Sequence, residues 1–579
     1  MRPLLLIVCL TACSPVAPTV DGGSGGGSAA GGSAVQVVDA GDPTAPLFDP
    51  DHLVEVSIDV APADWEVLRN QTRDLFTLLS GNCTSQPFPS PFTTFESTVT
   101  VDGTRLPRST VKKKGFLGSL SVNRPSLKLK FDANVPKQKV SGLDAMTLNN
   151  AQQDPSIVRQ CLGYALFRKA GLRAPRCNFA HVVVNGADLG VYAHVEAIDN
   201  DFLERHFTKK SGSLYEGTLS DFTTTFVGTF DLKNTGDRSD LERVTAALRA
   251  TDAELEVKLA AVIDLNQFID FWAMETLLRH WDGYAGNTNN FFIYDDPETG
   301  RFTFIPWGAD AVFGAEPSSA DNPEGPMLRG VLARRLYNVP ALRQRYLARV
   351  RSLLSSVFFE SELRREVVRM ENLVRPHVHP IQAAQLSNGL ADVRRFIDTR
   401  RTNLTRELTA APALAPSGER ASPCLYPLGR FDSTFSTNWG TITSENPFGV
   451  SSATFDLTLD GGTLPFARTA STAGIDTGGN DGPKAGVNLI AARADGTAML
   501  VGLRMLPQLY PPAPDAGVIP LDLVQRVGIV VEFVGGVVKP IGLLGPGTVE
   551  FTSASDVDGG VVSGHVSGQV VSWPFGAGM

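Results

Sequence analysis

The sequence predicts an α+β domain with a strand-rich lobe and then a helical lobe, followed by a small all-β sandwich domain. Between residues 53 and 132, short segments alternate apolar and polar side chains with the period of a half-buried strand. From Asp240 to Leu408, apolar residues instead recur at helical spacing. After Cys424, charged residues become rare, and short strand-like runs are separated by turn residues, as in a β-sandwich or barrel.

The strand patterns assign faces to the side chains. Within Ser126–Asp132, Leu127 and Leu129 share one face, so Lys128 and Lys130 share the other. Further strands are predicted at Val54–Val60, Ser97–Val101 and Ser109–Lys114, and a hairpin is predicted to join Ala180–Asn185 to Gly190–Ile198 through Asn185-Gly186.

Helices alternate with one more hairpin in the second lobe. A polar loop, Trp281–Asn289, precedes a hairpin that runs from Asn290–Tyr294 to Arg301–Pro306. The predicted helices are Ile157–Ala170 (capped by Ser156 and ended by Gly171), Leu241–Ala250, Ala253–Val262, Leu265–His280, Val339–Val357, Ser361–Val374 and Asp392–Leu408.

Composition narrows the class of protein. The chain has 579 residues, which at about one domain per 150 residues suggests two to four units. With 42% apolar and 20% charged residues, it is not disordered throughout. A net charge of -9 excludes a typical nucleic-acid-binding surface, and beyond the N-terminus no apolar run reaches the ~20 residues of a membrane span.

The N-terminus predicts export and a lipid anchor. Arg2 precedes the apolar stretch Leu4–Leu10, and Leu10-Thr11-Ala12-Cys13 resembles a bacterial lipobox. We therefore expect a signal peptide at residues 1–12, lipidation of Cys13 and a flexible Gly/Ser/Pro-rich tether at 13–47. Ser14, in place of Asp, favours the outer membrane of a Gram-negative cell envelope by the same resemblance. The alternative is a plain secretory signal with an incidental cysteine.

Four of the six cysteines remain once Cys9 and Cys13 are set aside. They allow three disulfide pairings, and Cys161 could bridge to Cys177 across a helix-to-strand connection. The alternative is that both are small buried thiols.

Several residues stand in the order that phosphoryl transfer requires. Gly115 and Gly118 lie in a turn between strands, where backbone amides can approach an anion. Lys128 and Lys130 follow on the next strand, and Asp282 begins the polar loop. Asn287 lies five residues after Asp282, and Asp310 follows the second hairpin.

These segments resemble the CotH (spore coat protein H) family of atypical kinases between about Val54 and Leu408. The resemblance is carried by His280-Trp281-Asp282-Gly283-Tyr284, Asn289 to Asp295, Phe304-Ile305-Pro306-Trp307 through Asp310, Phe313-Gly314, Leu148-Asn149-Asn150, Ala174-Pro175-Arg176, Gly190-Val191-Tyr192 and Val195 to Asp199. It implies a bilobal atypical protein-kinase-like domain, for which we set the bounds 48–410, before a β-rich domain at 425–579.

The resemblance also implies roles for individual residues. Asp282 is expected to act on the acceptor hydroxyl as a base or orienting group, and Lys128, with Lys130 as the alternative, to hold the phosphates. Gly115 and Gly118 are expected to cover the nucleotide, and Glu196 to lie at the hinge that meets its base. Asp310 is expected to bind Mg²⁺ together with Asn287, for which Asn289 and Asn290 are rivals.

Two positions depart from the family pattern. Gly308 stands where relatives often carry the first aspartate of a Trp-Asp-x-Asp pattern, and Gln160 stands where they often carry a glutamate. Each assignment also has an ordinary structural alternative. In these alternatives Asp282 and the asparagines only form turns, the lysines are a solvated strand face, and Gly115 and Gly118 make a tight turn.

The expected function is transfer of a phosphoryl group from Mg-ATP, with Mn²⁺ as an alternative metal, to Ser or Thr of envelope or secreted proteins. The expected partners are that acceptor protein and, through the lipid anchor, a membrane, with no nucleic acid. The alternative is a non-catalytic surface adhesion or coat-assembly lipoprotein with a degenerate kinase-like domain.

Overall fold

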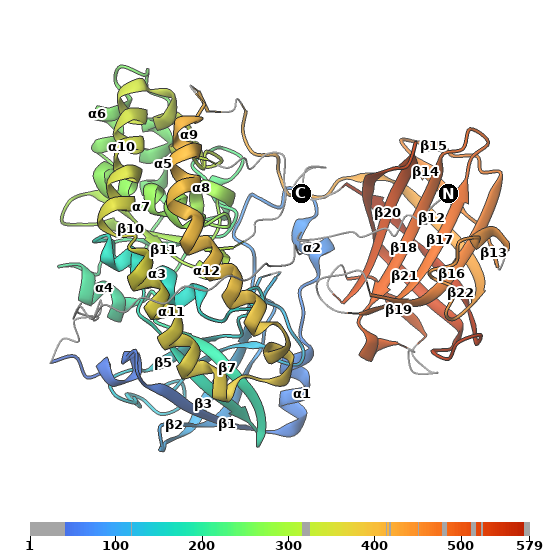
Figure 1. Cartoon of the computed structure of the whole chain (residues 1–579), viewed down its shortest axis with the longest axis horizontal. Coiled ribbons are helices and arrows are strands. Elements are labelled where there is room, and N and C mark those ends of the chain that lie inside the picture. The colour runs from blue at the N-terminus through green and yellow to red at the C-terminus, as the bar shows by residue number, and fades with distance from the viewer. Residues whose placement is uncertain are drawn as a thin grey trace, which may run out of the picture.

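The computed structural model describes residues 41–116, 118–314, 325–412, 414–415, 418–449, 451–477, 483–510, 517–522 and 525–572. The predicted signal peptide, Cys13 and most of the predicted tether lie outside these residues. The described chain forms a two-lobed α+β body and a separate all-β body (Figure 1), which is the fold class predicted from the sequence. Within the described residues, no helix combines the length and the apolar character needed to cross a bilayer.

The first lobe is a closed barrel whose strands follow the order β1-β2-β3-β4-β5-β7-β6. The closing pair, β1 and β6, is parallel, and the other pairs are antiparallel. Inward-facing residues such as Val56, Leu127 and Leu129 fill the interior. The strands are β1 Leu53–Val60, β2 Thr94–Val101, β3 Thr104–Lys114, β4 Ser126–Lys130, β5 Ala145–Asn149, β6 Cys177–Val184 and β7 Ala187–Val195.

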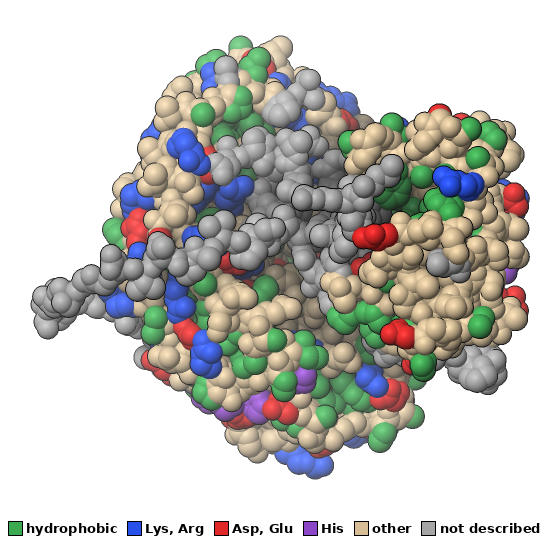
Figure 2. Space-filling model, turned by 45° about the vertical axis from the view of Figure 1, so that its right-hand side comes forward, with side chains coloured by type: hydrophobic (Ala, Val, Ile, Leu, Met, Phe, Trp, Pro, Cys, Tyr) green, Lys and Arg blue, Asp and Glu red, His purple; other side chains and the backbone are tan. Residues whose placement is uncertain are grey.

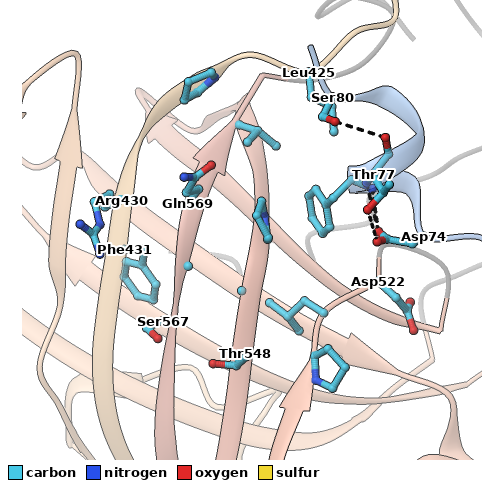
Figure 3. Close-up of a pocket in the computed structure, with 18 of the residues that line it drawn as sticks. Asp74, Thr77, Ser80, Leu425, Arg430, Phe431, Asp522, Thr548, Ser567 and Gln569 are labelled. Atoms are coloured by element: carbon cyan, nitrogen blue, oxygen red, sulfur yellow. Dashed lines mark hydrogen bonds between the residues drawn. The ribbon is translucent and has the colours of Figure 1, made fainter. Parts of the chain in front are cut away.

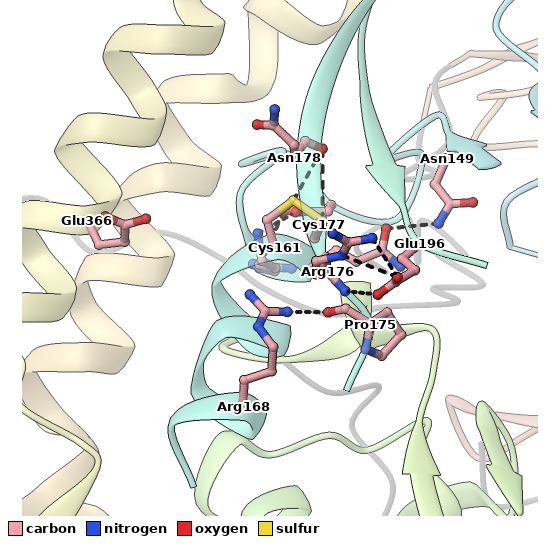
Figure 4. The surroundings of a disulfide bond; sticks show 12 residues. Asn149, Cys161, Arg168, Pro175, Arg176, Cys177, Asn178, Glu196 and Glu366 are labelled. Carbon is pink, nitrogen blue, oxygen red and sulfur yellow. Dashed lines mark hydrogen bonds and ion pairs between the residues drawn. A yellow bond between two sulfur atoms is a disulfide. The ribbon is translucent and has the colours of Figure 1, made fainter. Parts of the chain in front are cut away.

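Helix α3 (Arg159–Lys169) packs on the outside of the barrel and is tied to β6 by the disulfide Cys161–Cys177 (Figure 4). The helix begins at Arg159 rather than after Ser156, because the Asp154 carboxylate accepts hydrogen bonds from the Ser156 and Arg159 backbone N–H groups. The predicted cap was therefore wrong, although the helix itself is present.

The second lobe packs helices around a four-stranded sheet of order β11-β10-β8-β9. The predicted helix at Asp392 begins earlier, at Pro380, where His379 and Gln382 form a capping box. The elements are α4 Asn200–His206, β8 Leu214–Gly217, β9 Asp231–Leu232, α5 Ser239–Ala247, α6 Leu255–Ala260, α7 Leu265–Leu278, α8 Tyr284–Asn287, β10 Phe291–Asp296, β11 Arg301–Pro306, α9 Val331–Asn338, α10 Pro340–Ser356, α11 Glu360–Val374 and α12 Pro380–Thr409.

The C-terminal body is one sheet that curls over its own core. Its central path runs β15-β14-β12-β22-β21-β20-β18-β17-β16, and the backbone of Thr441 and Ile442, just after β12, bonds to Ala473 in β16. The strands are β12 Pro427–Asn438, β13 Ser452–Ala453, β14 Asp456–Leu459, β15 Gly462–Thr463, β16 Arg468–Asp476, β17 Lys484–Ala492, β18 Ala498–Met505, β19 Val518–Pro520, β20 Arg526–Val534, β21 Val537–Ala554 and β22 Val561–Val571.

A segment from the N-terminal part of the chain joins the two bodies. Helices α1 (Pro62–Asn70) and α2 (Leu75–Leu79) follow β1, and Phe76 and Leu79 of α2 are buried in the core of the C-terminal body. The disulfide Cys83–Cys424 closes this junction. A groove of about 1330 Å³ lies between α2 and the sheet, where Thr77 and Ser80 face Arg430, Thr548 and Gln569 (Figure 3).

Candidate active site

The loop after α7 holds Asp282 in a clasp of three amides. Asn287 Nδ2 and Asn289 Nδ2 donate to Asp282 Oδ1 at 2.6 and 3.2 Å, and Asn290 Nδ2 donates to Oδ2 at 2.7 Å. Burial raises the pKa of Asp282, whereas the three hydrogen bonds favour its charged form. The carboxylate is thus fixed in one orientation by residues within eight positions of it.

Glu275, a fully buried acid on α7, anchors this loop from behind. Its Oε1 and Oε2 accept hydrogen bonds from the backbone N–H groups of Tyr284 and Ala285 at 2.7 and 2.8 Å. Burial raises the pKa of Glu275 to about 8. The sequence analysis did not single out Glu275, although an acid within an apolar helix was a usable signal.

The second aspartate, Asp310, reaches the same site from the end of the β10–β11 hairpin. Trp307 N donates to Asn290 O at 3.1 Å, and His280 Nε2 donates to Gly308 O at 3.1 Å, so the two loops are joined directly. Burial raises the pKa of Asp310 to about 7, and the negative charges of Asp282 and Asp154 add to the effect. The structure therefore brings Asp282 and Asp310 together.

Local packing explains why position 308 is a glycine in this chain. A Cβ placed on Gly308 would lie 2.4 Å from Asn290 Oδ1, and the residue has a φ of +50°. The side chain of Asn290 occupies the space that an acid at 308 would need. Asn290 and Gly308 thus fit each other, and the Asn290 amide orients Asp282.

Lys114 approaches the Asp310 segment from the barrel. Its Nζ lies 5.6 Å from the centre of the Trp307 ring and donates to Asn149 Oδ1 at 2.5 Å. Burial lowers the pKa of Lys114 to about 8, and the negative charges of Glu216 and Asp310 oppose that shift. Lys114 ends β3, directly before the predicted glycine turn.

The two lysines predicted for the phosphate role lie elsewhere on the same sheet face. Lys128 has an exposed side chain. Lys130 Nζ forms ion pairs with Asp132 and Asp144 at 3.0 and 2.8 Å. Lys114 is the lysine that contacts Trp307, whereas alternation along β4 fixed the face of Lys128 and Lys130 but not their distance from the aspartates.

Gln160 connects to the lysine through an intermediate side chain. Asn149 Nδ2 donates to Gln160 Oε1 at 2.9 Å, while Asn149 Oδ1 accepts from Lys114. Two neutral side chains, Asn149 and Gln160, thus link Lys114 on β3 to α3. The missing charge at Gln160 is evident from the sequence, whereas this link is not.

The glycine turn follows β3, as predicted. Gly115 has a φ of +127°, which favours glycine, and its carbonyl accepts a hydrogen bond from Arg73 Nε at 3.1 Å. Gly118 lies against Gln153, whose amide would be 2.3 Å from an added Cβ.

The carboxylate of Glu196 is bound by two arginines of the same chain (Figure 4). It accepts hydrogen bonds from the Arg176 backbone and guanidinium at 2.9 to 3.2 Å and forms a further ion pair with Arg205. Although burial opposes the shift, the charges of Arg176 and Arg205 hold the pKa of Glu196 below its usual value. The geometry gives no support to the predicted contact between Glu196 and the nucleotide base.

Arg420 was missed by the sequence analysis because it lies outside the kinase-like segment. Its Nη1 donates to the backbone carbonyl of Asn287 and, at 2.8 Å, to Thr288 Oγ1. The positive charge of Arg420 also favours the ionised form of Asp282. The connection to the C-terminal body therefore contacts the loop that carries Asp282.

The oxygen atoms of this site suit a hard divalent cation. Asn287 Oδ1 is buried and has no hydrogen-bond partner among the described residues, and the carboxylates of Asp282 and Asp310 lie in the same site. Mg²⁺ prefers carboxylate and amide oxygens. The residues present therefore fit the metal that the sequence predicted.

A barrel lobe and a helical lobe that bring together a lysine, an asparagine and two aspartates define a kinase-like domain. The CotH kinase protein family matches residues 111–403, about half of the chain, and the chain belongs to this family.

Three known proteins resemble part of the chain. Inner spore coat protein H of Bacillus subtilis is 24% identical over 257 residues, which cover 41% of this chain and 69% of that protein. Spore coat protein homolog 1 of Rhizopus delemar is 24% identical over 255 residues, which cover 40% of this chain and 41% of that protein. The crystal structure of a Helicobacter pylori proinflammatory kinase covers 51% of this chain and 93% of its own, with 11% identity and a TM-score of 0.28.

Proposed function

We propose that this protein transfers the terminal phosphoryl group of Mg-ATP to a Ser or Thr hydroxyl of an envelope or secreted protein. The observation that carries the proposal is a set of direct contacts between the segments of Lys114, Asp282 and Asp310. Asn290 bonds to Asp282 and accepts a hydrogen bond from Trp307, three residues before Asp310, and Lys114 lies over the Trp307 ring. Phosphoryl transfer depends mainly on positioning and on neutralising charge, and these residues supply both.

Each residue has a distinct role in this proposal. Asp282, fixed by the asparagine clasp, orients the acceptor hydroxyl and accepts its proton. Asp310 and Asn287 Oδ1 would hold Mg²⁺, which when bound neutralises charge on the phosphates. Lys114 binds the phosphate oxygens with its ammonium group.

The neutral chain behind Lys114 is compatible with this role. No carboxylate at position 160 competes with the nucleotide for the ammonium, and Asn149 still directs it by a hydrogen bond. The bound phosphates themselves would favour the protonated lysine, which counteracts the effect of burial on its pKa.

Export and membrane anchoring remain part of the proposal. The lipobox-like sequence ending at Cys13 supports a lipid anchor on the cell envelope, and the outer membrane is the favoured location. The two disulfides, Cys83–Cys424 and Cys161–Cys177, also support an oxidising compartment.

A non-catalytic surface adhesion or coat-assembly role is the second candidate. Gly308 and Gln160, both neutral where acids are common in the family, favour it. The two candidates differ in whether the site binds Mg-ATP at all. Nucleotide that binds the native state raises the melting temperature, so a wild-type protein that shows no rise over a broad range of Mg-ATP would support adhesion.

Incubation with labelled ATP tests phosphoryl transfer. The wild-type chain is expected to label itself or added protein, whereas Asp282→Ala and Asp310→Ala are expected to lose the label. Lys130→Ala is the matched control, because Lys130 lies on the neighbouring strand and pairs with Asp132 and Asp144. Label that survives both aspartate substitutions would refute the site.

A further inference from the structure

A second cluster of ligand-type side chains lies on the surface of the barrel lobe, outside the candidate active site. Histidine side chains gather beside acidic ones low on the two-lobed body in Figure 2. The cluster consists of Glu55 on β1, His181 on β6 and His377 in the 3-10 segment Arg375–His377 (η4), between α11 and α12. One ligand atom from each of the three lies within 4.8 Å of the others.

The contacts within the cluster already orient its side chains. Glu55 Oε2 lies 2.8 Å from His181 Nδ1, and the rings of His181 and His377 have centroids 5.1 Å apart. On its other side, His181 Nε2 bonds to Asp188 Oδ1 at 3.1 Å, and the same oxygen accepts from Gly190 N at 2.7 Å. A carboxylate behind a histidine is the usual support of a metal-bound imidazole.

We propose that Glu55, His181 and His377 bind one divalent transition-metal ion of the zinc class, with Asp188 as the positioning residue behind His181. Two imidazole nitrogens and one carboxylate oxygen form a donor set that Zn²⁺ accepts, with water at the fourth position. Mg²⁺ and Ca²⁺ instead prefer oxygen ligands throughout. This inference is independent of the proposed kinase activity.

The metal would link the two lobes. Glu55 and His181 belong to the barrel, whereas His377 belongs to the turn between two helices of the second lobe. That turn is already seated on the barrel, because Gln382 Nε2 donates to Val191 O at 3.2 Å. In addition, a Cβ on Gly190 would lie 2.4 Å from His379 N, so the backbones are in close contact there. Packing therefore brings the ligands together before any metal binds.

The same contacts could serve only as ion pairs between His181 and its two carboxylates. A metal site and an ion-pair cluster give opposite results with zinc. Ion pairs alone gain nothing from the ion, whereas a metal site gains native-state stability with increasing free Zn²⁺.

The test uses the full chain without a polyhistidine tag, stripped with a chelator and titrated with Zn²⁺ alone. We expect the melting temperature to rise and calorimetry to show one tight site. The His377→Ala and Glu55→Gln variants are expected to lose both effects, and Asp188→Asn to weaken binding about 10- to 100-fold. Co²⁺ in place of zinc is expected to give visible absorption in the wild type but not in His377→Ala or Glu55→Gln.

Two controls separate this site from other zinc binding. His565 pairs with Asp432 at 3.0 Å on the C-terminal sheet, so His565→Ala removes an exposed histidine–carboxylate pair and should leave the zinc response unchanged. Asp310→Ala should leave it unchanged as well. A wild-type protein that does not respond to zinc, or a response that survives in both His377→Ala and Glu55→Gln, would overturn the proposal.

Discussion

The two sides of the candidate active site are built in different ways. On the helical-lobe side, Asp282 is held by three amides and its loop by Glu275, all within residues 275–290. On the barrel side, Lys114 is directed by Asn149, which in turn contacts Gln160 on another element. The first side is local and redundant, whereas the second rests on a single chain of contacts between distant residues. Substitutions should therefore have different consequences on the two sides.

The largest effect is expected for Lys114→Ala. Loss of the ammonium group removes the charge that we propose to bind the phosphates, so kcat/KM for ATP should fall on the order of a hundredfold or more. Lys128→Ala is the control and should change kcat/KM little, because Lys128 is exposed on the same sheet face. The comparison is made by ATP-dependent labelling at fixed Mg²⁺. The reverse ranking would assign the phosphate role to Lys128 in place of Lys114.

Glu275→Ala should cause the largest loss of stability on the helical-lobe side. The substitution leaves the buried backbone N–H groups of Tyr284 and Ala285 without their acceptor, at about 1–3 kcal/mol for each group. Urea unfolding measures the change in the free energy of unfolding. A loss below about 0.5 kcal/mol, the range of ordinary surface substitutions, would show that the loop does not depend on this anchor.

The same glutamate predicts a pH dependence of stability. Because the pKa of Glu275 is raised from 4.5 to about 8 in the native state, the native protein keeps a proton that the unfolded chain releases. Its contribution is fully present below about pH 4.5 and is lost as the pH rises to about 8. Glu275→Gln, which cannot titrate, should flatten this part of the stability curve between pH 5 and 8, as measured by unfolding at constant ionic strength.

The helical-lobe side of the site could be predicted from the sequence, and the barrel side could not. Asp282, Asn287, Asn290 and Asp310 follow one another along the chain, so order and spacing were sufficient to place them in one site. The choice of Lys114 depends instead on how far β3 and β4 each extend towards the helical lobe, and barrel closure decides that.

The fold shows the same contrast. The strands and helices with clear periodicity were predicted, often within a few residues of their observed ends. The elements α1, α2, α9, β5 and β8 were not predicted, because each is short and is stabilised by tertiary packing. Glu196 was placed at the correct strand end, but its binding to Arg176 and Arg205 depends on partners that a single strand pattern does not reveal.

A smaller effect is expected for Arg420→Ala. Arg420 bonds to the carbonyl of Asn287 and to Thr288 Oγ1, and its charge favours the ionised form of Asp282. Because the asparagine clasp remains, we expect kcat to fall about tenfold, the cost of roughly one hydrogen bond to a charged group. Arg420→Lys keeps the charge and should recover part of the loss. Wild-type activity in Arg420→Ala would show that the clasp is sufficient without the connection to the C-terminal body.

The smallest effect at neutral pH is expected for Gln160→Glu, which tests the barrel side of the site. The glutamate can still accept the hydrogen bond from Asn149 Nδ2, but it adds a negative charge behind Lys114 and should raise the pKa of Lys114 above its present value of about 8. At pH 7 a lysine with that pKa is already roughly nine-tenths protonated, so kcat/KM should change less than about twofold. The alkaline limb of the pH profile of kcat/KM should move to higher pH, because the wild type loses the Lys114 ammonium as the pH passes about 8. Gln160→Ala should not move this limb upward, since it adds no charge. An unchanged limb in Gln160→Glu would mean that the ammonium of Lys114 does not govern the reaction, and the neutral chain from Gln160 to Lys114 would then be a packing contact alone.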